Sequence, residues 1–283
     1  MKVSITFDRL RWEEKALREA AEAAGLEAAL VDSKGLTFEV PKGRPELGDI
    51  VLQRCISHYR SSTLTLMLEG AGLKVINSHG VAETCSNKLS TSIALARAKV
   101  PTPRTFLTLS SEAAEEAAEK LGYPLVLKPF IGSWGRMVTV VRDRSTLQSL
   151  IEYKEELANP QEQHMYYLQE YVRRPPRDVR AIVAGDSIVA CVHRIAPAGE
   201  WRTNVARGAV SKALKPDDEL KEIILNAAEA VGGGILGVDA MESESGYLVH
   251  EVNNTVEFRG AQSAVETDIP AQLIRYVSRV ARR

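Results

Sequence analysis

The chain has 283 residues, of which 45% are hydrophobic and 26% are charged. This length suits one large domain or two smaller ones with a full apolar core. The 36 basic and 37 acidic residues nearly cancel, to a formal net charge of −1. The composition therefore provides no overall field that would attract nucleic acid or an anionic membrane.

Three cysteines, Cys55, Cys85 and Cys191, are spread along the chain without a C-x-x-C pair. Their odd number and wide spacing argue against a disulfide framework or a zinc site and favour a reducing compartment. The first residues lack the long apolar stretch of a signal peptide, and no later run reaches about eighteen apolar residues. We therefore expect a cytoplasmic protein that is neither exported nor membrane-spanning.

The first 85 residues alternate between strand and helix patterns. Residues 3–7 alternate apolar and polar side chains, as in a half-buried strand, and residues 13–24 form a helix pattern that stops at Gly25. Later in this part of the chain, a helix is expected at 61–69 and short strands at 28–31, 49–52 and 73–76. Because such alternation is typical of a parallel sheet, we predict a doubly wound α/β domain over residues 1–85.

A helical pattern between Ser78 and Lys99 leads to Pro101 and Pro103, which mark a domain edge. We predict a linker helix and a central antiparallel subdomain over residues 86–172, with strands expected at 105–109, 125–128, 137–141 and 166–172. Residues 173–283 form the predicted C-terminal subdomain. Its strands are expected at 180–184, 187–192, 235–241 and 247–253, and its helices at 217–231 and 269–280.

A strand that ends at Lys128 runs into the sequence Pro-Phe-Ile-Gly-Ser-Trp-Gly-Arg. The two glycines, Gly132 and Gly135, allow the backbone to approach a ligand and to point N–H groups at an anion, while Lys128 and Arg136 add positive charge. This pattern predicts a phosphate-binding loop at the tip of a hairpin that could close as a lid. Considered alone, it also fits an ordinary β-turn.

Oxygen ligands gather on the predicted strand 247–253. Glu251 and Asn253 are two residues apart, so their side chains leave the same face. Asp239 joins them if the connection between its strand and theirs has an odd number of residues, which would place it opposite Val249 and diagonal to Glu251. Such a set suits Mg²⁺. The alternative is an exposed sheet face without a metal.

These motifs, in this order, resemble those of the ATP-grasp ligases, and within them the RimK-like branch with its LysX ligases. The resemblance covers essentially the whole chain and is carried by residues 128–136, 169–172, 177–180, 203–208 and 251–259. It implies an α/β (α+β) fold. In this fold an N-terminal parallel α/β domain precedes a central antiparallel lid subdomain and a C-terminal antiparallel sheet with helices.

The resemblance also implies which residues form the site. ATP is the expected cofactor, with two Mg²⁺ ions at Asp239, Glu251 and Asn253. The nucleotide is expected to contact Lys88, Lys128, Gly132, Ser133, Trp134, Gly135, Arg136, Gln169, Glu170, Tyr171, Val172, Asp178, Arg194, Arg202, Thr203, Asn204 and Arg207. The substrate is expected to contact Arg180, Arg194, Asn204, Asn253, Asn254, Thr255, Val256, Glu257 and Phe258. The charges of Lys128, Arg180 and Arg194 would support catalysis.

The implied reaction is ATP-driven amide formation through an acyl phosphate. The carboxylate would be the side chain of the C-terminal glutamate of a small acidic, LysW-like carrier protein, and the amine L-2-aminoadipate, in lysine biosynthesis. A homo-oligomer, a dimer or a tetramer, is expected. Asn253-x-Thr255 resembles the aminoadipate form of the signature, whereas glutamate-using relatives carry Gly-Thr-Gly-Glu. Because the two amines differ by one methylene, use of glutamate stays open.

Two other functions stay open at this point: a RimK-like ligase that adds glutamate to another protein, and a regulatory protein that binds ATP without turnover. The chain also departs from the family pattern. His193 stands where an arginine is expected, Ala209 where a glycine is usual, and His250 in place of asparagine. Because side chains alternate along strands, we expect His193 and His250 to point away from the site.

Overall fold

The computed structural model describes residues 1–40, 43, 45–132, 136–157, 164–204 and 208–282. A parallel sheet in the order β2-β1-β3-β4 forms the N-terminal part of the chain. Its elements are β1 (Lys2–Phe7), α1 (Trp12–Ala23), β2 (Glu27–Asp32), a 3₁₀ turn (Ser33–Gly35), β3 (Ile50–Gln53), α2 (His58–Gly70) and β4 (Lys74–Ile76). The parallel α/β arrangement expected from the alternating pattern is confirmed.

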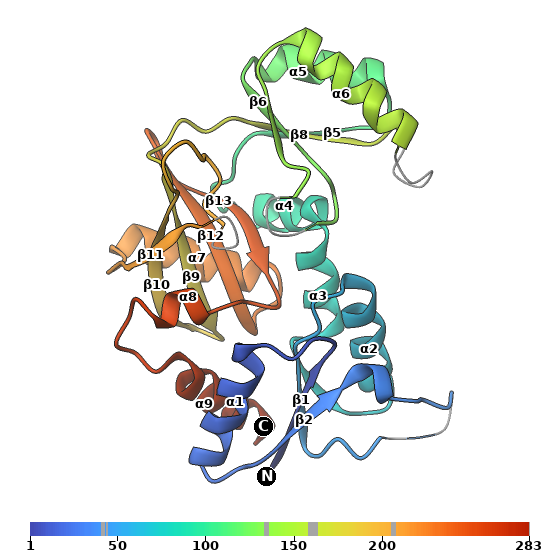
Figure 1. The fold of residues 1–283 in the computed structure, drawn as a ribbon, viewed down its shortest axis with the longest axis vertical. Coiled ribbons are helices and arrows are strands. Elements are labelled where there is room, and N and C mark those ends of the chain that lie inside the picture. Colours follow the sequence, from blue (N-terminus) through green and yellow to red (C-terminus); the bar gives the residue numbers. More distant parts are fainter. Residues whose placement is uncertain (41–42, 44, 133–135, 158–163, 205–207, 283) are drawn as a thin grey trace.

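Two consecutive helices, α3 (His79–Ser86) and α4 (Lys88–Arg97), carry the chain from the first sheet towards the second (Figure 1). The expected helical stretch is broken at Asn87, which has an extended backbone and caps α4. Its Oδ1 accepts hydrogen bonds from the backbone N–H groups of Leu89 and Ser90, at 2.9 and 3.3 Å. This break places Lys88 at the first position of α4.

The second sheet is antiparallel, in the order β5-β8-β6-β7. Helices α5 and α6 cover one of its faces (Figure 1) and pack on it through buried side chains such as Ala114, Leu125, Leu147 and Leu168. This sheet forms the lid subdomain of the fold. Its elements are β5 (Thr105–Thr108), α5 (Ser111–Leu121), β6 (Leu125–Lys128), β7 (Thr139–Val141), α6 (Arg144–Leu157) and β8 (Tyr166–Glu170).

The third sheet, also antiparallel, has the order β11-β10-β9-β12-β13. Helix α7 packs on one face. The other face shares a hydrophobic core with the first sheet, in which Ile5 and Ile50 meet Ile182 and Ile235. The elements are β9 (Arg177–Ala184), β10 (Ser187–Ile195), β11 (Val210–Ala213), α7 (Asp218–Ala230), β12 (Ile235–Ser243), β13 (Gly246–Asn253), α8 (Arg259–Gln262) and α9 (Ile269–Ala281).

This shared core joins the two ends of the chain. Helix α9 packs against α1, and both termini lie beside the first sheet (Figure 1). The first and third sheets therefore form one body, whereas the lid has a core of its own. The divisions after residues 85 and 172 remain our proposal. None of the helices in the described residues is both long and apolar enough to span a bilayer.

Candidate active site

The β12–β13 hairpin differs from the expected geometry in one respect. Its strands are joined by the two residues Glu244 and Ser245, so the condition of an odd-numbered connection, set for Asp239 to join Glu251 and Asn253, is not met. A β-bulge compensates, because Ala240 pairs with Val249 while Asp239 pairs with Glu251. Asp239 therefore lies directly opposite Glu251, and not opposite Val249.

The extra residue of the bulge is His250, and the structure corrects the expectation that it points away. Ligand atoms of Asp239, His250 and Glu251 all lie within 4.8 Å of one another. A bulge sets two consecutive residues against one partner, which breaks the simple alternation of side chains. His193 agrees with the expectation, since its Nε2 atom lies 3.7 Å from Glu242, away from this cluster.

The donor set of this cluster fits Mg²⁺. Glu251 and Asp239 offer carboxylate oxygens, and Asn253, two residues beyond Glu251 on β13, adds an amide. Hard oxygen donors with room for water and phosphate are what Mg²⁺ takes in proteins. Within the described part of the chain, the buried atoms His250 Nδ1 and Asn253 Nδ2 have no hydrogen-bond partner.

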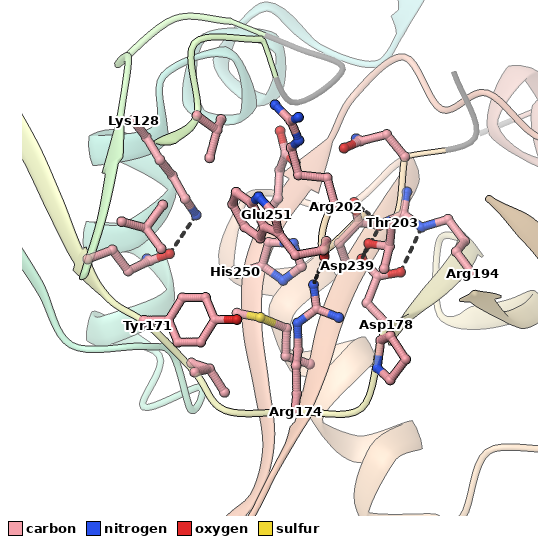
Figure 2. Close-up of a pocket in the computed structure, with 18 of the residues that line it drawn as sticks. Lys128, Tyr171, Arg174, Asp178, Arg194, Arg202, Thr203, Asp239, His250 and Glu251 are labelled. Atoms are coloured by element: carbon pink, nitrogen blue, oxygen red, sulfur yellow. Dashed lines mark hydrogen bonds and ion pairs between the residues drawn. The ribbon is translucent and has the colours of Figure 1, made fainter. Parts of the chain in front are cut away.

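A cavity of about 250 Å³ lies between the lid and the third sheet (Figure 2). The structure brings together most of the residues predicted to hold a nucleotide or a metal at its walls: Lys88, Lys128, Gly132, Arg136, Gln169, Glu170, Tyr171, Val172, Asp178, Arg194, Arg202, Thr203, Asn204, Asp239 and Glu251. Ser133, Trp134, Gly135 and Arg207 lie outside the described residues.

Two lysines from different elements converge at the start of the glycine loop. Lys88 Nζ donates a hydrogen bond to the Gly132 carbonyl at 2.7 Å and lies 3.9 Å from a Glu251 carboxylate oxygen. Lys128 Nζ donates to Gln169 Oε1 at 2.5 Å. Desolvation lowers the pKa of Lys128 to about 8, although Glu251 opposes the shift. A bound anion would relieve this cost.

Two arginines surround the buried carboxylate of Asp239. Arg180 donates to both of its oxygens, and Arg194 Nη2 lies 3.0 Å from Oδ2. Arg194 also makes a two-point contact with Asp178, at 2.9 and 2.6 Å, and Thr203 Oγ1 donates to Asp178. Burial alone would raise the pKa of Asp239, but the two guanidinium groups hold it well below its ordinary value.

Aromatic and apolar side chains also line this cavity. Tyr171 and Trp201 face each other with ring centroids 6.4 Å apart, and the walls include Val126, Val138 and Met241. A cavity whose walls include both aromatic rings and cationic side chains suits a nucleotide, because the base can stack on a ring while the phosphates meet the charges.

Sequence reasoning missed several residues of this first cavity. Arg174 donates from Nη2 to the Trp201 carbonyl at 3.2 Å, and it lines the cavity together with His250. A signal was present for Arg174, because it follows the predicted Glu170–Val172 strand within two residues. For His250, the departure from the family pattern was the available signal.

A second cavity, of about 910 Å³, lies between the first and third sheets. It meets the first cavity at residues common to both walls: Gly132, Arg194, Asn204 and Glu251. Predicted substrate residues that also line it are Arg180, Asn253, Asn254, Thr255 and Glu257. Val256 and Phe258 line neither cavity. Their side chains are fully buried in the core, so in this structure they cannot contact a bound molecule.

Comparisons with known proteins agree with this architecture. The family described as a RimK-like ATP-grasp domain matches residues 85–277, and the LysX preATP-grasp domain matches residues 3–84. The chain is 39% identical over 251 residues to the alpha-aminoadipate–LysW ligase LysX of Saccharolobus solfataricus, covering 88% of this chain and 90% of that protein. It is 35% identical over 280 residues to the glutamate–LysW ligase ArgX of Sulfolobus acidocaldarius, covering 98% of each.

Solved structures show the same fold. The RimK domain ATP-grasp protein from Sphaerobacter thermophilus superposes with a TM-score of 0.79 at 25% identity, covering 98% of this chain and 100% of that one. The ATP-grasp ligase PsnB, in a complex with minimal precursor, Mg and ADP, gives a TM-score of 0.74 at 20% identity, covering 99% and 98%. This chain therefore belongs to the RimK-like ATP-grasp family and is an ATP-dependent carboxylate–amine ligase.

Proposed function

We propose that this enzyme joins the α-amino group of L-2-aminoadipate to the side-chain carboxylate of the C-terminal glutamate of a small acidic, LysW-like carrier protein, in lysine biosynthesis. The observation that carries the proposal is that the two cavities meet at Arg194 and Glu251. A nucleotide in the smaller cavity and an amide-forming substrate pair in the larger one would bring their reacting groups together there. Relatives named LysX and ArgX support the carrier protein as partner.

The reaction would follow two balanced steps. A carboxylate oxygen attacks the γ-phosphorus of ATP, the bond to ADP breaks, and an acyl phosphate forms. The amine then attacks the acyl carbon, phosphate leaves, and the nitrogen loses a proton. Lys88, Lys128 and Arg194 would neutralise the transferring phosphoryl group, because all three place positive charge at the wall of the smaller cavity. No side-chain nucleophile is required.

Mg²⁺ would be held by Asp239, Glu251 and Asn253, and it would neutralise phosphate charge in the bound nucleotide. We propose that two Mg²⁺ ions bind. Asp239 is already engaged by Arg180 and Arg194. We propose that these arginines shift their donors towards the substrate carboxylates, which guanidinium groups suit, when the cation takes up Asp239.

A specific observation keeps glutamate as a second candidate for the amine. Similarity to an aminoadipate ligase and to a glutamate ligase is of the same order, at 39% and 35% identity. This chain carries Asn253-x-Thr255, which resembles the aminoadipate form of the signature and therefore favours aminoadipate. The difference of one methylene corresponds to about 1 to 3 kcal/mol of discrimination in a pocket, so use of both amines is compatible with this site.

The test is an ADP-release assay with aminoadipate, glutamate or lysine, each with and without an acidic carrier protein that ends in glutamate. We expect ADP release only with the carrier, fastest with aminoadipate, and a product with the mass of carrier plus amine minus water. Equal release without the carrier would contradict the proposal. A preference for glutamate would select the second candidate.

We further propose that the enzyme works in the cytoplasm as a homo-oligomer. Cell fractionation can check the localisation, and light scattering can check the oligomeric state.

A further inference from the structure

Residues 254–259 form one wall of the larger cavity, and the N-terminal part of the chain holds this wall residue by residue. Asn77 Nδ2 donates to the Asn254 carbonyl at 2.8 Å. Thr255 Oγ1 donates to the Cys55 carbonyl at 3.5 Å. The contacts come from residues about two hundred positions away in the sequence, so the C-terminal sheet alone does not fix the wall.

The same pattern continues through the rest of the segment. Arg11 Nη1 lies 3.0 Å from Glu257 Oε1, and the Arg259 backbone N–H donates to Glu13 Oε1 at 3.2 Å. Trp12 packs edge-on against Phe258, with ring centroids 5.8 Å apart. From Asn254 to Arg259, the segment therefore meets the first domain along its whole length.

From Thr255 to Arg259, residues that line the cavity are separated by residues that are buried in the core. Thr255, Glu257 and Arg259 line the cavity, while Val256 and Phe258 are fully buried. Because the buried and the cavity-lining residues share one continuous backbone, the position of the cavity-lining side chains depends on what holds the buried residues between them. The contacts of Val256 and Phe258 thus decide where the cavity wall stands.

Arg54 holds both of these core residues. Its Nη2 donates to the Val256 carbonyl at 2.9 Å, and its guanidinium lies 5.9 Å from the Phe258 ring centroid. The Arg54 side chain is only 2% exposed, directly after β3.

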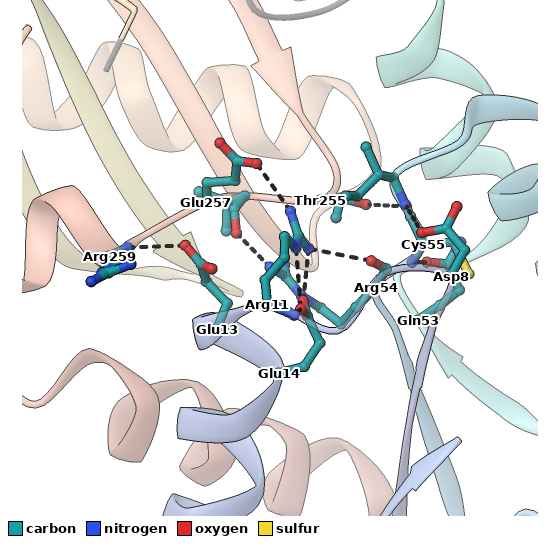
Figure 3. Close-up of polar contacts among 12 residues, drawn as sticks. Asp8, Arg11, Glu13, Glu14, Gln53, Arg54, Cys55, Thr255, Glu257 and Arg259 are labelled. Carbon is teal, nitrogen blue, oxygen red and sulfur yellow. Dashed lines mark hydrogen bonds and ion pairs between the residues drawn. The ribbon is translucent and has the colours of Figure 1, made fainter. Parts of the chain in front are cut away.

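Glu14, on α1, orients this arginine. Its Oε1 accepts from Arg54 Nε at 3.2 Å and from Arg11 Nη2 at 2.7 Å, and its Oε2 accepts from Arg11 Nε at 3.1 Å (Figure 3). The Glu14 side chain is fully buried. A planar guanidinium can meet a carboxylate and a carbonyl at once in fixed directions, which a lysine ammonium cannot do.

Neither Arg54 nor Glu14 lines either cavity. We propose that Arg54, oriented by Glu14, is a positioning residue that fixes the wall 254–259 and thereby sets the discrimination between amines that differ by one methylene. The proposal rests on the proposed function. Its physical basis is that a pocket rejects a longer or shorter substrate by a factor of about 10 to 200 per methylene only while its wall cannot relax.

The first experiment compares Arg54→Lys and the nearly isosteric Glu14→Gln with wild type. The measured quantity is the ratio of kcat/KM for the preferred amine to that for the other one. We expect this ratio to fall at least about fivefold towards one, mainly through KM for the amine, with KM for ATP within about twofold. A variant that merely unfolds in part would lose activity on both amines equally and leave the ratio unchanged.

Arg18→Lys is the matched control, because Arg18 lies on α1 one turn from Glu14 and pairs within the helix with Glu22 at 3.5 Å. We expect Arg18→Lys to keep the wild-type ratio of kcat/KM for the two amines. A ratio within about twofold of wild type in both test variants would overturn the proposal.

The second experiment needs no turnover and so separates this inference from the proposed function. Hydrogen–deuterium exchange of the purified full chain should be faster at residues 254–259 in Arg54→Lys than in wild type, with exchange over β6 unchanged. Unchanged exchange of the segment would overturn the positioning role, whatever the substrate is. The two results can also disagree. If the wild-type enzyme ligates neither amine while exchange at residues 254–259 is faster in Arg54→Lys, the proposed function and the selectivity are contradicted but the positioning role of Arg54 stands.

Discussion

Asp239 and Glu251 lie directly opposite each other across the β12–β13 hairpin because His250 is the extra residue of a β-bulge. Without the bulge, the two-residue turn would pair Asp239 with His250 and send Glu251 to the other face of the sheet. The bulge thus assembles the carboxylates of the cation site, and it brings an imidazole within 4.8 Å of both. The site consequently offers a nitrogen donor beside its oxygens.

The first prediction concerns the choice of metal. Imidazole suits Mn²⁺ and later first-row ions better than it suits Mg²⁺. We expect His250→Asn to weaken Mn²⁺ binding about tenfold, or about 1.4 kcal/mol, and to leave Mg²⁺ binding nearly unchanged. Electron paramagnetic resonance of free Mn²⁺, titrated into protein with ADP, measures this directly. His193→Asn, away from the cluster, serves as the control; equal Mn²⁺ affinity in all three proteins would show that His250 is not a ligand.

The second prediction concerns Glu251, which reaches both cavities and lies 3.9 Å from Lys88. Glu251→Gln keeps the size of the side chain but removes the charge that would hold the cation beside the phosphates. We expect kcat to fall about 10²- to 10³-fold, the range for loss of one group that stabilises transition-state charge. Steady-state ADP release measures it. Glu244→Gln, in the exposed turn of the same hairpin, should retain full activity, and an active Glu251→Gln enzyme would contradict the assignment.

The third prediction concerns pH. Because desolvation lowers the pKa of Lys128 to about 8, the free protein loses this proton above about pH 8, whereas an ordinary lysine keeps it to about 10.5. Bound phosphate favours the charged form, so ADP binding should take up about half a proton at pH 8 and close to one proton near pH 9, and affinity should fall as pH rises from 7 to 9. Calorimetry in buffers of different ionisation enthalpy measures the uptake.

Lys128→Arg provides the matched test, since arginine stays charged throughout this range. We expect it to remove the proton uptake and to flatten the pH dependence of ADP affinity. Unaltered uptake in this variant would assign the proton to another group.

The fourth prediction concerns stability at the junction of the first and third sheets. Gly234 has φ of +111°, and a Cβ there would lie 2.2 Å from Asn77 Oδ1, which accepts from the Ile235 N–H at 2.6 Å. Gly234→Ala should lower the free energy of unfolding by about 2 to 5 kcal/mol, through backbone strain and loss of buried hydrogen bonds. Gly233→Ala is the control: φ is +74°, but no atom lies within 4 Å of its Cβ position.

For Gly233→Ala we expect a loss of only about 1 to 2 kcal/mol, the strain of the left-handed conformation alone. Urea denaturation followed by circular dichroism compares the two. Similar losses for both substitutions would mean that the contact with Asn77 contributes little.

Much of the fold followed from local patterns. The alternation of strands and helices over residues 1–85 predicted the parallel sheet, because each pattern spans only a few residues and buries one face. The Gly185-Asp186 turn between β9 and β10 was likewise predictable, since the two strands are adjacent in sequence. The residues of the glycine loop and of the acidic strand were visible as motifs for the same reason.

The placement of the site residues needed three dimensions. Parity arguments assume a regular pleat, so they required an odd-numbered connection in the β12–β13 hairpin, which the bulge made unnecessary, and they turned His250 away from the site. The family motif also did not separate the buried Val256 and Phe258 from the cavity-lining Thr255 and Glu257, because a motif names neighbours in sequence without stating which of them face a core.

The sequence by itself determined the order of the sheets and the types of residue available for phosphate and metal binding, because these depend on short-range patterns, and its motifs carried the resemblance to the family. Only the tertiary structure decided that Arg194 lies between Asp178 and Asp239, that two cavities meet at Glu251, and that Arg54 supports a wall 202 residues away. Such pairings depend on how separate sheets pack through a shared core. Contacts between segments that are distant in sequence produce no periodic pattern from which they could be predicted.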